Sequence, residues 1–246
     1  LPLLLKLHTY ENHARFTSRH FRDQRLHAAF SYQNMYMGLS AWDAPATYSF
    51  LQYIELAEGI WMPDGGYYAV VEDIAAIGAE LGVTFHYGTE AVSIERNGNG
   101  VTGITTADGS RFDADIVVVN ADLPYAYDRL LSDEKRWNKL RKQRFTNSCF
   151  MFYWGVSGGD LAPLTHHNAF LTDHVMRESF DEIFKDFGVP REPSFYVNIP
   201  SRTDATMAPT GGDAVTVLVP VGYIDENHPH DWDGELDRVR SYVFDR

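Results

Sequence analysis

The chain has 246 residues, 44% of them hydrophobic and 14% aromatic, which is enough apolar material for one large domain or two small ones. Its formal net charge of -13 argues against a nucleic-acid partner, because phosphates are met by clustered Lys and Arg. The single cysteine, Cys149, cannot form an internal disulfide, which fits an intracellular, reducing compartment. No apolar run approaches the ~20 residues of a transmembrane helix.

The first 62 residues are rich in aromatic side chains. In residues 1–30, apolar side chains recur at helical spacing among His, Arg and Asp, which predicts helix. Residues 31–62 have few charges and many Tyr, Trp and Met side chains. This composition is typical either of a packed helical core or of the wall of a tunnel for a hydrophobic ligand.

Gly65-Gly66 opens a block that ends at Asp122. Val70, Ile74 and Ile77 form one helical stripe that we expect to face a sheet. We predict strands at Val83–Tyr87 and Ile116–Val119, lying parallel in one buried sheet because the second is a continuous β-branched run. Between them, turn sequences predict a three-stranded meander formed by Ala91–Arg96, Val101–Thr106 and Arg111–Asp113.

The rest of the chain alternates helices and strands. We predict helix over residues 125–144, with a basic cluster that is either a solvated face or a contact for a membrane surface. The remaining patterns predict two amphipathic helices, at Arg177–Phe187 and Trp232–Phe244. They also predict three strands, at Phe150–Val156, Phe195–Ile199 and Val215–Val221.

Few motifs point to particular chemistry. His166 and His167 are adjacent, so on a strand they would face opposite sides, and no metal-ligand spacing is present; we predict no metal site. No Gly-x-Ser-x-Gly elbow suggests a serine hydrolase. Asp43 and Glu55 are the only carboxylates within the aromatic stretch before Glu58, and neither can be assigned as a catalytic base, so the catalytic residues stay unknown.

Asn120, Ala121 and Asp122 follow the predicted buried strand. Ligands of doubly wound sheets bind beyond the carboxyl ends of parallel strands, so these small residues are candidates to meet a cofactor. The alternative is a simple β-to-helix turn in which Asp122 caps the helix. No phosphate-binding Gly-x-Gly-x-x-Gly occurs, and the chain starts at Leu1, so we expect it to be the centre of a larger protein.

Three separated stretches resemble one family. "LHAAFSYQNMYM" at Leu26–Met37, followed by "APATYSFLQYIELAEGIWMPDGG" at 44–66, is similar to the bacterial and fungal phytoene desaturases. So are "VVVNADLPYAYDRLL" at 117–131 and "SFYVNIPSRTDATMAPTGGDAVTVLVPVG" at 194–222. The resemblance implies FAD-dependent dehydrogenation of a C40 isoprenoid in carotenoid biosynthesis, on a flavin-containing amine oxidase-like fold.

The resemblance also implies roles for individual residues. By position in the family's motifs, the FAD contacts would be Gly65, Gly66, Ala91, Val92, Asn120 and Ala121. The lining of the hydrophobic substrate site would include Tyr32, Met35, Tyr36, Tyr48, Tyr53 and Trp61. Without the pyrophosphate-binding loop, we expect the 246 residues by themselves not to hold FAD tightly.

The expected architecture is α/β, of mixed α+β character. Residues 63–131 would form the central part of a Rossmann-type FAD domain, and residues 1–62 and 132–246 a substrate domain built on a mixed sheet and helices. A peripheral membrane contact would suit such a substrate. Three alternatives stay open: a carotenoid isomerase, a retinoid saturase, or a non-catalytic isoprenoid-binding module.

Overall fold

The computed structural model describes residues 8–98, 100–143, 145–158, 161–172, 176–224 and 228–246. The chain divides into two compact units, one formed by 1–71 together with 146–246, and the other by 72–145. The architecture is mixed α and β, with one antiparallel sheet in each unit, as expected for the fold class.

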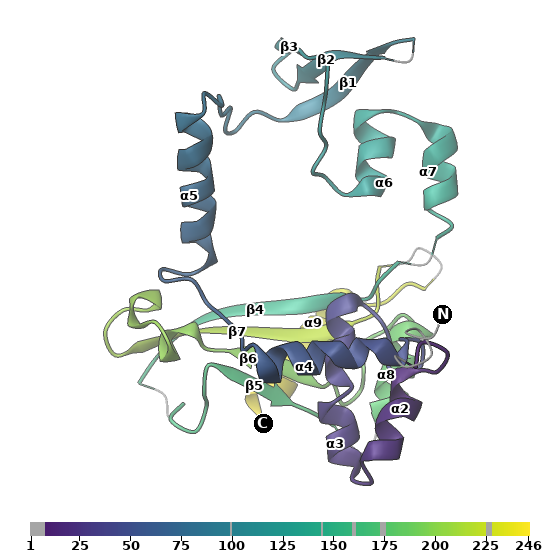
Figure 1. Cartoon of the computed structure of the whole chain (residues 1–246), viewed down its shortest axis with the longest axis vertical. Coiled ribbons are helices and arrows are strands. Elements are labelled where there is room, and N and C mark those ends of the chain that lie inside the picture. The colour runs from purple at the N-terminus through teal and green to yellow at the C-terminus, as the bar shows by residue number, and fades with distance from the viewer. Residues whose placement is uncertain (1–7, 99, 144, 159–160, 173–175, 225–227) are drawn as a thin grey trace. The chain divides into compact units, whose positions relative to one another are not determined.

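A four-stranded sheet organises the first unit (Figure 1). Its strand order is β4-β7-β6-β5, and every described pair is antiparallel, so the expected mixed sheet is wrong in this respect. Three of its strands confirm the predicted strands, whereas β5 was not predicted. The bounds are β4 Ser148–Ser157, β5 His167–Phe170, β6 Phe195–Asn198 and β7 Gly212–Val221.

The two faces of this sheet have different partners. Along β7, Val215, Val217 and Val219 are buried and alternate with partly exposed residues. This buried face packs against α9 (Trp232–Phe244), whose Val239 is fully buried in the same apolar cluster (Figure 1). We call the opposite face the cleft face. The register places on it the side chains of Met151, Tyr153, His167, Ala169, Tyr196, Asn198, Thr216 and Leu218.

Short helices complete the first unit. The helix predicted over 1–30 is broken at Phe21, which is extended, and Asp23 then caps the next helix; residues 1–7 lie outside the described part. The helix predicted at Arg177–Phe187 ends three residues earlier, at Phe184. The bounds are α2 His13–His20, α3 Gln24–Ala29, α4 Phe50–Ala57 and α8 Met176–Phe184, with 3₁₀ turns at Tyr32–Met37, Ala46–Ser49, Pro200–Arg202 and Ala205–Met207.

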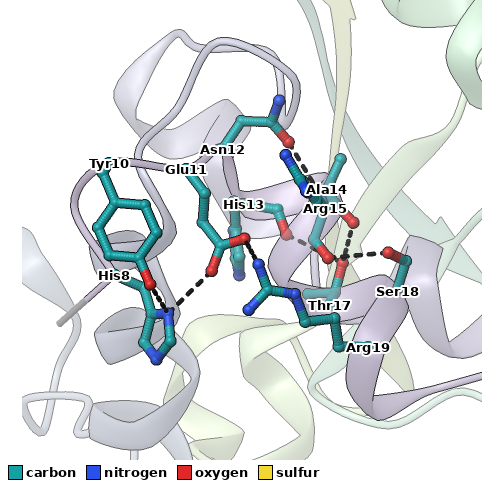
Figure 2. A network of polar contacts seen from close by, with 10 residues as sticks. All are labelled: His8, Tyr10, Glu11, Asn12, His13, Ala14, Arg15, Thr17, Ser18 and Arg19. Carbon is teal, nitrogen blue, oxygen red and sulfur yellow. Dashed lines mark hydrogen bonds and ion pairs between the residues drawn. The ribbon is translucent and has the colours of Figure 1, made fainter. Parts of the chain in front are cut away.

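A polar network fixes the start of α2 (Figure 2). The Asn12 side chain accepts from the Arg15 amide at 2.8 Å and so caps the helix. The buried Glu11 carboxylate pairs with Arg19 through one oxygen, and its other oxygen lies 2.9 Å from His8 Nδ1. Pairing of this kind is what a buried carboxylate requires, and we therefore assign these groups to structure.

The second unit contains the predicted three-stranded meander. Strands β1 (Ala91–Asn97), β2 (Gly100–Thr106) and β3 (Arg111–Asp113) pair in sequence order and confirm that prediction. The helix predicted over 125–144 is divided into α6 (Leu123–Tyr125), a π-helical turn at Ala126–Leu130, and α7 (Glu134–Leu140). Asp133 caps α7 by accepting from the Arg136 amide.

The predicted parallel sheet is wrong for this chain. Neither 83–87 nor 116–119 forms a strand, and Ile116 is 81% exposed. A parallel strand needs neighbours for its N–H and C=O groups, and no described segment pairs with either run. The helix α5 (Tyr67–Glu80) does form, but Val70, Ile74 and Ile77 are exposed, so the expected packing of its stripe on a sheet is also wrong.

Within the described ranges, no helix is both long and apolar enough to cross a bilayer.

Candidate functional site

A cleft of about 910 Å³ lies in the first unit, between the cleft face of the sheet and the segment that begins in α4. This volume is at the upper end of the range typical of small-molecule pockets. One wall is mainly apolar, from Ile60 to Tyr67, and the other is mainly polar. Its lining residues are Glu55, Ile60, Trp61, Met62, Gly66, Tyr67, His166, His167, Tyr196, Asn198, Pro200, Thr203, Met207 and Thr216.

Strand alternation explains the polar wall. In β6, Phe195 and Val197 are buried against the core, so Tyr196 and Asn198 point the other way, into the cleft. Asn198 pairs with His167 on one side and with Thr216 on the other, so three neighbouring strands contribute side chains in one row. The Asn198 side-chain oxygen is buried and has no hydrogen-bond partner among the described residues.

Two stacked histidines stand in this row. Their ring centroids are 4.1 Å apart and their planes differ by 14°. The expectation that adjacent histidines on a strand face opposite sides does not apply to this pair, because His166 precedes β5. His166 Nδ1 lies 2.6 Å from the Thr203 hydroxyl, and His167 Nδ1 forms a short hydrogen bond with the Tyr196 hydroxyl.

The environment of His167 and Tyr196 favours the neutral forms of these two side chains. Burial lowers the pKa of His167, the neighbouring His166 lowers it further, and Glu55 acts in the opposite direction. Burial, aided by Tyr36, Glu55 and Tyr67, raises the pKa of Tyr196 to about 12. At neutral pH the His167 imidazole is therefore an unprotonated base beside a protonated phenol. Glu55 itself accepts a hydrogen bond from the Gln33 amide at 3.1 Å.

The six predicted substrate-lining residues are not gathered in one place. Trp61 lines the cleft. Burial and the nearby Glu55 raise the pKa of Tyr36, and Tyr36 in turn helps to raise the pKa of Tyr196. Tyr32 and Met35 instead line a small apolar cavity of about 20 Å³ next to α8. Tyr48 stacks on Phe50, and Tyr53 is exposed on α4.

The predicted cofactor contacts occur in both units. Gly65 and Gly66 precede α5 and have left-handed backbone conformations, which favour glycine. The Gly65 amide donates to Asp204 at 2.9 Å and the Gly66 amide to the Pro63 carbonyl at 3.0 Å, so neither N–H is available to a phosphate. The other four lie in the second unit: Ala91 and Val92 in β1, and Asn120 and Ala121 in an exposed segment outside any helix or strand.

Sequence reasoning missed most of the polar cleft wall. The pattern Phe195-Tyr196-Val197-Asn198 does carry the signal, since alternation places Tyr196 and Asn198 on one face. No pattern shows that β5 pairs with β6, and without that pairing His167 cannot be placed beside Tyr196. Across the part of the chain that the structure describes, no group of three or more His, Cys, Asp or Glu side chains could hold a metal ion.

Comparison with known proteins supports the resemblance. A phytoene desaturase from Cercospora nicotianae is 46% identical over 92% of this chain and 37% of that protein. One from Neurospora crassa is 42% identical over 99% of the chain and 43% of that protein. A zeta-carotene-forming phytoene desaturase from Myxococcus xanthus is 45% identical over 93% and 44%. The chain thus spans less than half the length of these curated relatives.

Solved structures share the fold. An oxidoreductase from Methanosarcina mazei matches with a TM-score of 0.66 at 16% identity, over 95% of this chain and 52% of that one. A protein from Pyrococcus furiosus matches with a TM-score of 0.62 at 15% identity, over 98% and 58%. Residues 2–154, more than half of the chain, match the family described as flavin containing amine oxidoreductase. The chain therefore belongs to the flavin-containing amine oxidoreductase family.

Proposed function

We propose that the protein containing this chain is an FAD-dependent desaturase that introduces double bonds into a C40 isoprenoid such as phytoene. The observation that carries the proposal is the 41–46% identity to phytoene desaturases over at least nine-tenths of the chain. The names of these relatives favour desaturation over the isomerase, saturase and non-catalytic alternatives.

The second unit is the better candidate for cofactor contacts in this chain. A flavin, when bound, supplies an acceptor for hydride from a C–H bond. The short side chains and exposed backbone at Asn120-Ala121 fit close approach of a nucleotide, as does the exposed Val92 on β1. Gly65 and Gly66 fit less well, because their amides already have acceptors; we assign them to the turn that starts α5.

The first unit supplies the proposed substrate site. Its cleft joins an apolar wall that includes Ile60 and Trp61 to a row of polar side chains on the sheet. An apolar wall suits a hydrocarbon chain, which offers nothing to hydrogen-bond. The chain's own residues would orient the isoprenoid and exclude water, and the polar row would handle protons. In this assignment, residues 1–62 and 132–246 belong to the substrate domain and 63–131 to the FAD domain.

A direct test is flavin reduction by the substrate. The flavin-loaded protein that contains this chain is mixed anaerobically with phytoene in phosphatidylcholine vesicles, and the flavin absorbance is followed. We expect bleaching by phytoene, and desaturated products by chromatography once an electron acceptor is added. An unbleached flavin with phytoene, together with bleaching by primary amines, would instead support an amine oxidase.

We also propose that the protein contacts the membrane peripherally, since its substrate would reside in the bilayer. The support is a set of exposed apolar side chains on α4 and just after it: Phe50, Tyr53, Ile54, Leu56, Ile60 and Trp61. Burial of such side chains in the interface strengthens membrane binding. Vesicle flotation tests the idea: Leu56→Asp should reduce flotation, and unchanged flotation would contradict this surface.

A further inference from the structure

We propose that His167, held by the Tyr196 hydroxyl, is the base that accepts the proton during isoprenoid dehydrogenation. The inference rests on the proposed function and gives a role to residues of the cleft that the sequence patterns left unassigned. It also identifies where the second hydrogen goes.

The chemistry requires two hydrogens to leave adjacent carbons. One leaves an allylic carbon as hydride, with the electrons of its C–H bond, and a bound flavin would supply the acceptor for it. The other leaves the neighbouring carbon as a proton to His167 Nε2, and the electrons of that C–H bond become the new C=C bond. Because loss of hydride makes an allylic cation whose adjacent C–H is strongly acidic, a neutral imidazole is a sufficient base.

The geometry leaves the correct nitrogen available. His167 Nδ1 is occupied by the Tyr196 hydroxyl, whereas Nε2 has no hydrogen-bond partner among the described residues. In the tautomer that we propose, Nδ1–H donates to the phenol oxygen, and Nε2 then carries the free lone pair that a base needs. Both side chains line the cleft, with Trp61 also in its lining.

The groups around His167 favour this role. On its own segment, His166 stacks against it and disfavours a charged ring before reaction. From the other elements, Tyr196 and Tyr36, whose pKa values are raised by burial, stay neutral near pH 7, and the Glu55 carboxylate favours the imidazolium that forms on proton transfer. Glu55 is the weaker candidate for the base itself, since one of its oxygens already accepts from Gln33.

A structural role for the pair predicts different behaviour. Tyr196 and His167 lie on paired strands, so their hydrogen bond could only strengthen the β5 edge. In that case His167→Asn would lower stability and flavin content but leave the pH dependence of the reaction unchanged. If His167 is the base, His167→Asn should change the pH dependence of the reaction and leave stability and flavin content unchanged. The two roles can therefore be separated by experiment.

The experiment measures anaerobic flavin reduction by phytoene at saturating concentration, from about pH 5 to 9, in wild type, His167→Asn, Tyr196→Phe and the control His20→Asn. His20 lies on α2 in the same unit and does not line the cleft. We expect the rates of wild type and of the control to fall in the same way toward acid pH, and we call this fall the acidic limb. His167→Asn should reduce the rate roughly 100-fold or more and abolish that limb, with flavin content and half-saturating phytoene unchanged.

Tyr196→Phe provides the second test, because it keeps the ring and removes only the hydroxyl. We expect a smaller rate loss and an acidic limb moved to lower pH, since the imidazolium loses an acceptor for its Nδ1–H. This variant decides the question if His167→Asn loses flavin.

The outcomes are distinct. If phytoene does not reduce wild-type flavin, the proposed function fails, and this inference fails with it. If wild type reacts and His167→Asn keeps its rate and acidic limb, the function stands and His167 is not the base.

Discussion

At the scale of single residues, Gly222 is the glycine of the described residues where an added Cβ would have least room. A Cβ added there would lie 2.1 Å from the Phe187 carbonyl carbon, and backbone cannot move aside as a side chain can. We expect Gly222→Ala to lower the free energy of unfolding of the first unit by about 1–3 kcal/mol. Urea unfolding followed by circular dichroism measures the change.

Gly155 is the matched control for that substitution. It lies in β4, which pairs with β7, the strand that ends just before Gly222, and a Cβ there would meet nothing within 4 Å. Gly155→Ala should be neutral or stabilise by up to about 1 kcal/mol, because alanine loses less chain entropy on folding. Equal losses for the two variants would show that crowding at Gly222 is not the cause.

The buried His13 makes stability depend on pH. Burial lowers its pKa in the folded state, partly offset by a hydrogen bond to the side-chain oxygen of Asn34, which lies 3.1 Å from His13 Nδ1. As pH falls below about 6.5, the unfolded chain binds a proton at His13 more readily than the folded chain does, so the free energy of unfolding decreases toward acid pH. The stabilisation that neutral His13 contributes is fully present only above that pH. His13→Gln should therefore show a smaller fall between about pH 7.5 and 5.5. If the urea midpoints of wild type and His13→Gln changed with pH in the same way, a neutral, buried His13 would be contradicted.

Residue-level site prediction reached only part of the cleft. The family resemblance implied that Trp61 belongs to the lining of the substrate site, and Trp61 does line the cleft. His167 and Tyr196 were out of reach because they are 29 residues apart and meet through strand pairing, which no local pattern encodes. For Gly65 and Gly66, the resemblance implied FAD contacts, and nothing in the sequence indicated that Asp204 and Pro63 accept from their amides.

At the scale of elements, exposure within the second unit can be tested directly. Ile94 in β1 is 8% exposed, whereas Ile116, in the run predicted as a buried strand, is 81% exposed. We expect Ile94→Asn to cost about 2 kcal/mol or more, because it removes buried apolar area and buries an amide. Ile116→Asn should stay within about 0.5 kcal/mol. A large loss for Ile116→Asn in urea unfolding would mean that this segment is covered in solution.

Local sequence patterns predicted the elements whose backbone hydrogen bonds lie within the element itself or join it to the next strand in the sequence. The meander followed from its turns at Asn97-Gly98 and Asp108-Gly109, and Trp232–Phe244 followed from its helical period. The strand β5 was missed because Thr165–Phe170 is short and polar, so its pairing with β6 decides its conformation. Ile116–Val119 failed for the opposite reason: its composition suits a strand, but no described segment pairs with it.

At the scale of the whole molecule, the two units have unequal cores. The first buries a continuous cluster between its sheet and α9, including Val217, Val219 and Val239. In the second, the described buried apolar side chains are Ile94, Ala126 and Leu130. Since burial of apolar area is the main source of stability, we expect the second unit to open more readily.

Hydrogen exchange can show whether each unit opens on its own. Amides of β6 and β7 should exchange far more slowly than those of β1 and β2, because local stability follows the core that each element joins. Val239→Ala removes fully buried methyl groups from the first unit, at a cost of about 2 kcal/mol, and should speed β6 and β7 exchange roughly 30-fold. Val239→Ala should leave the exchange rates of the β1 and β2 amides unchanged. Ile94→Asn should instead speed exchange in β1 and β2 and leave β6 and β7 unchanged. If Val239→Ala accelerated both sheets by the same factor, the chain would unfold as one cooperative body rather than as two units.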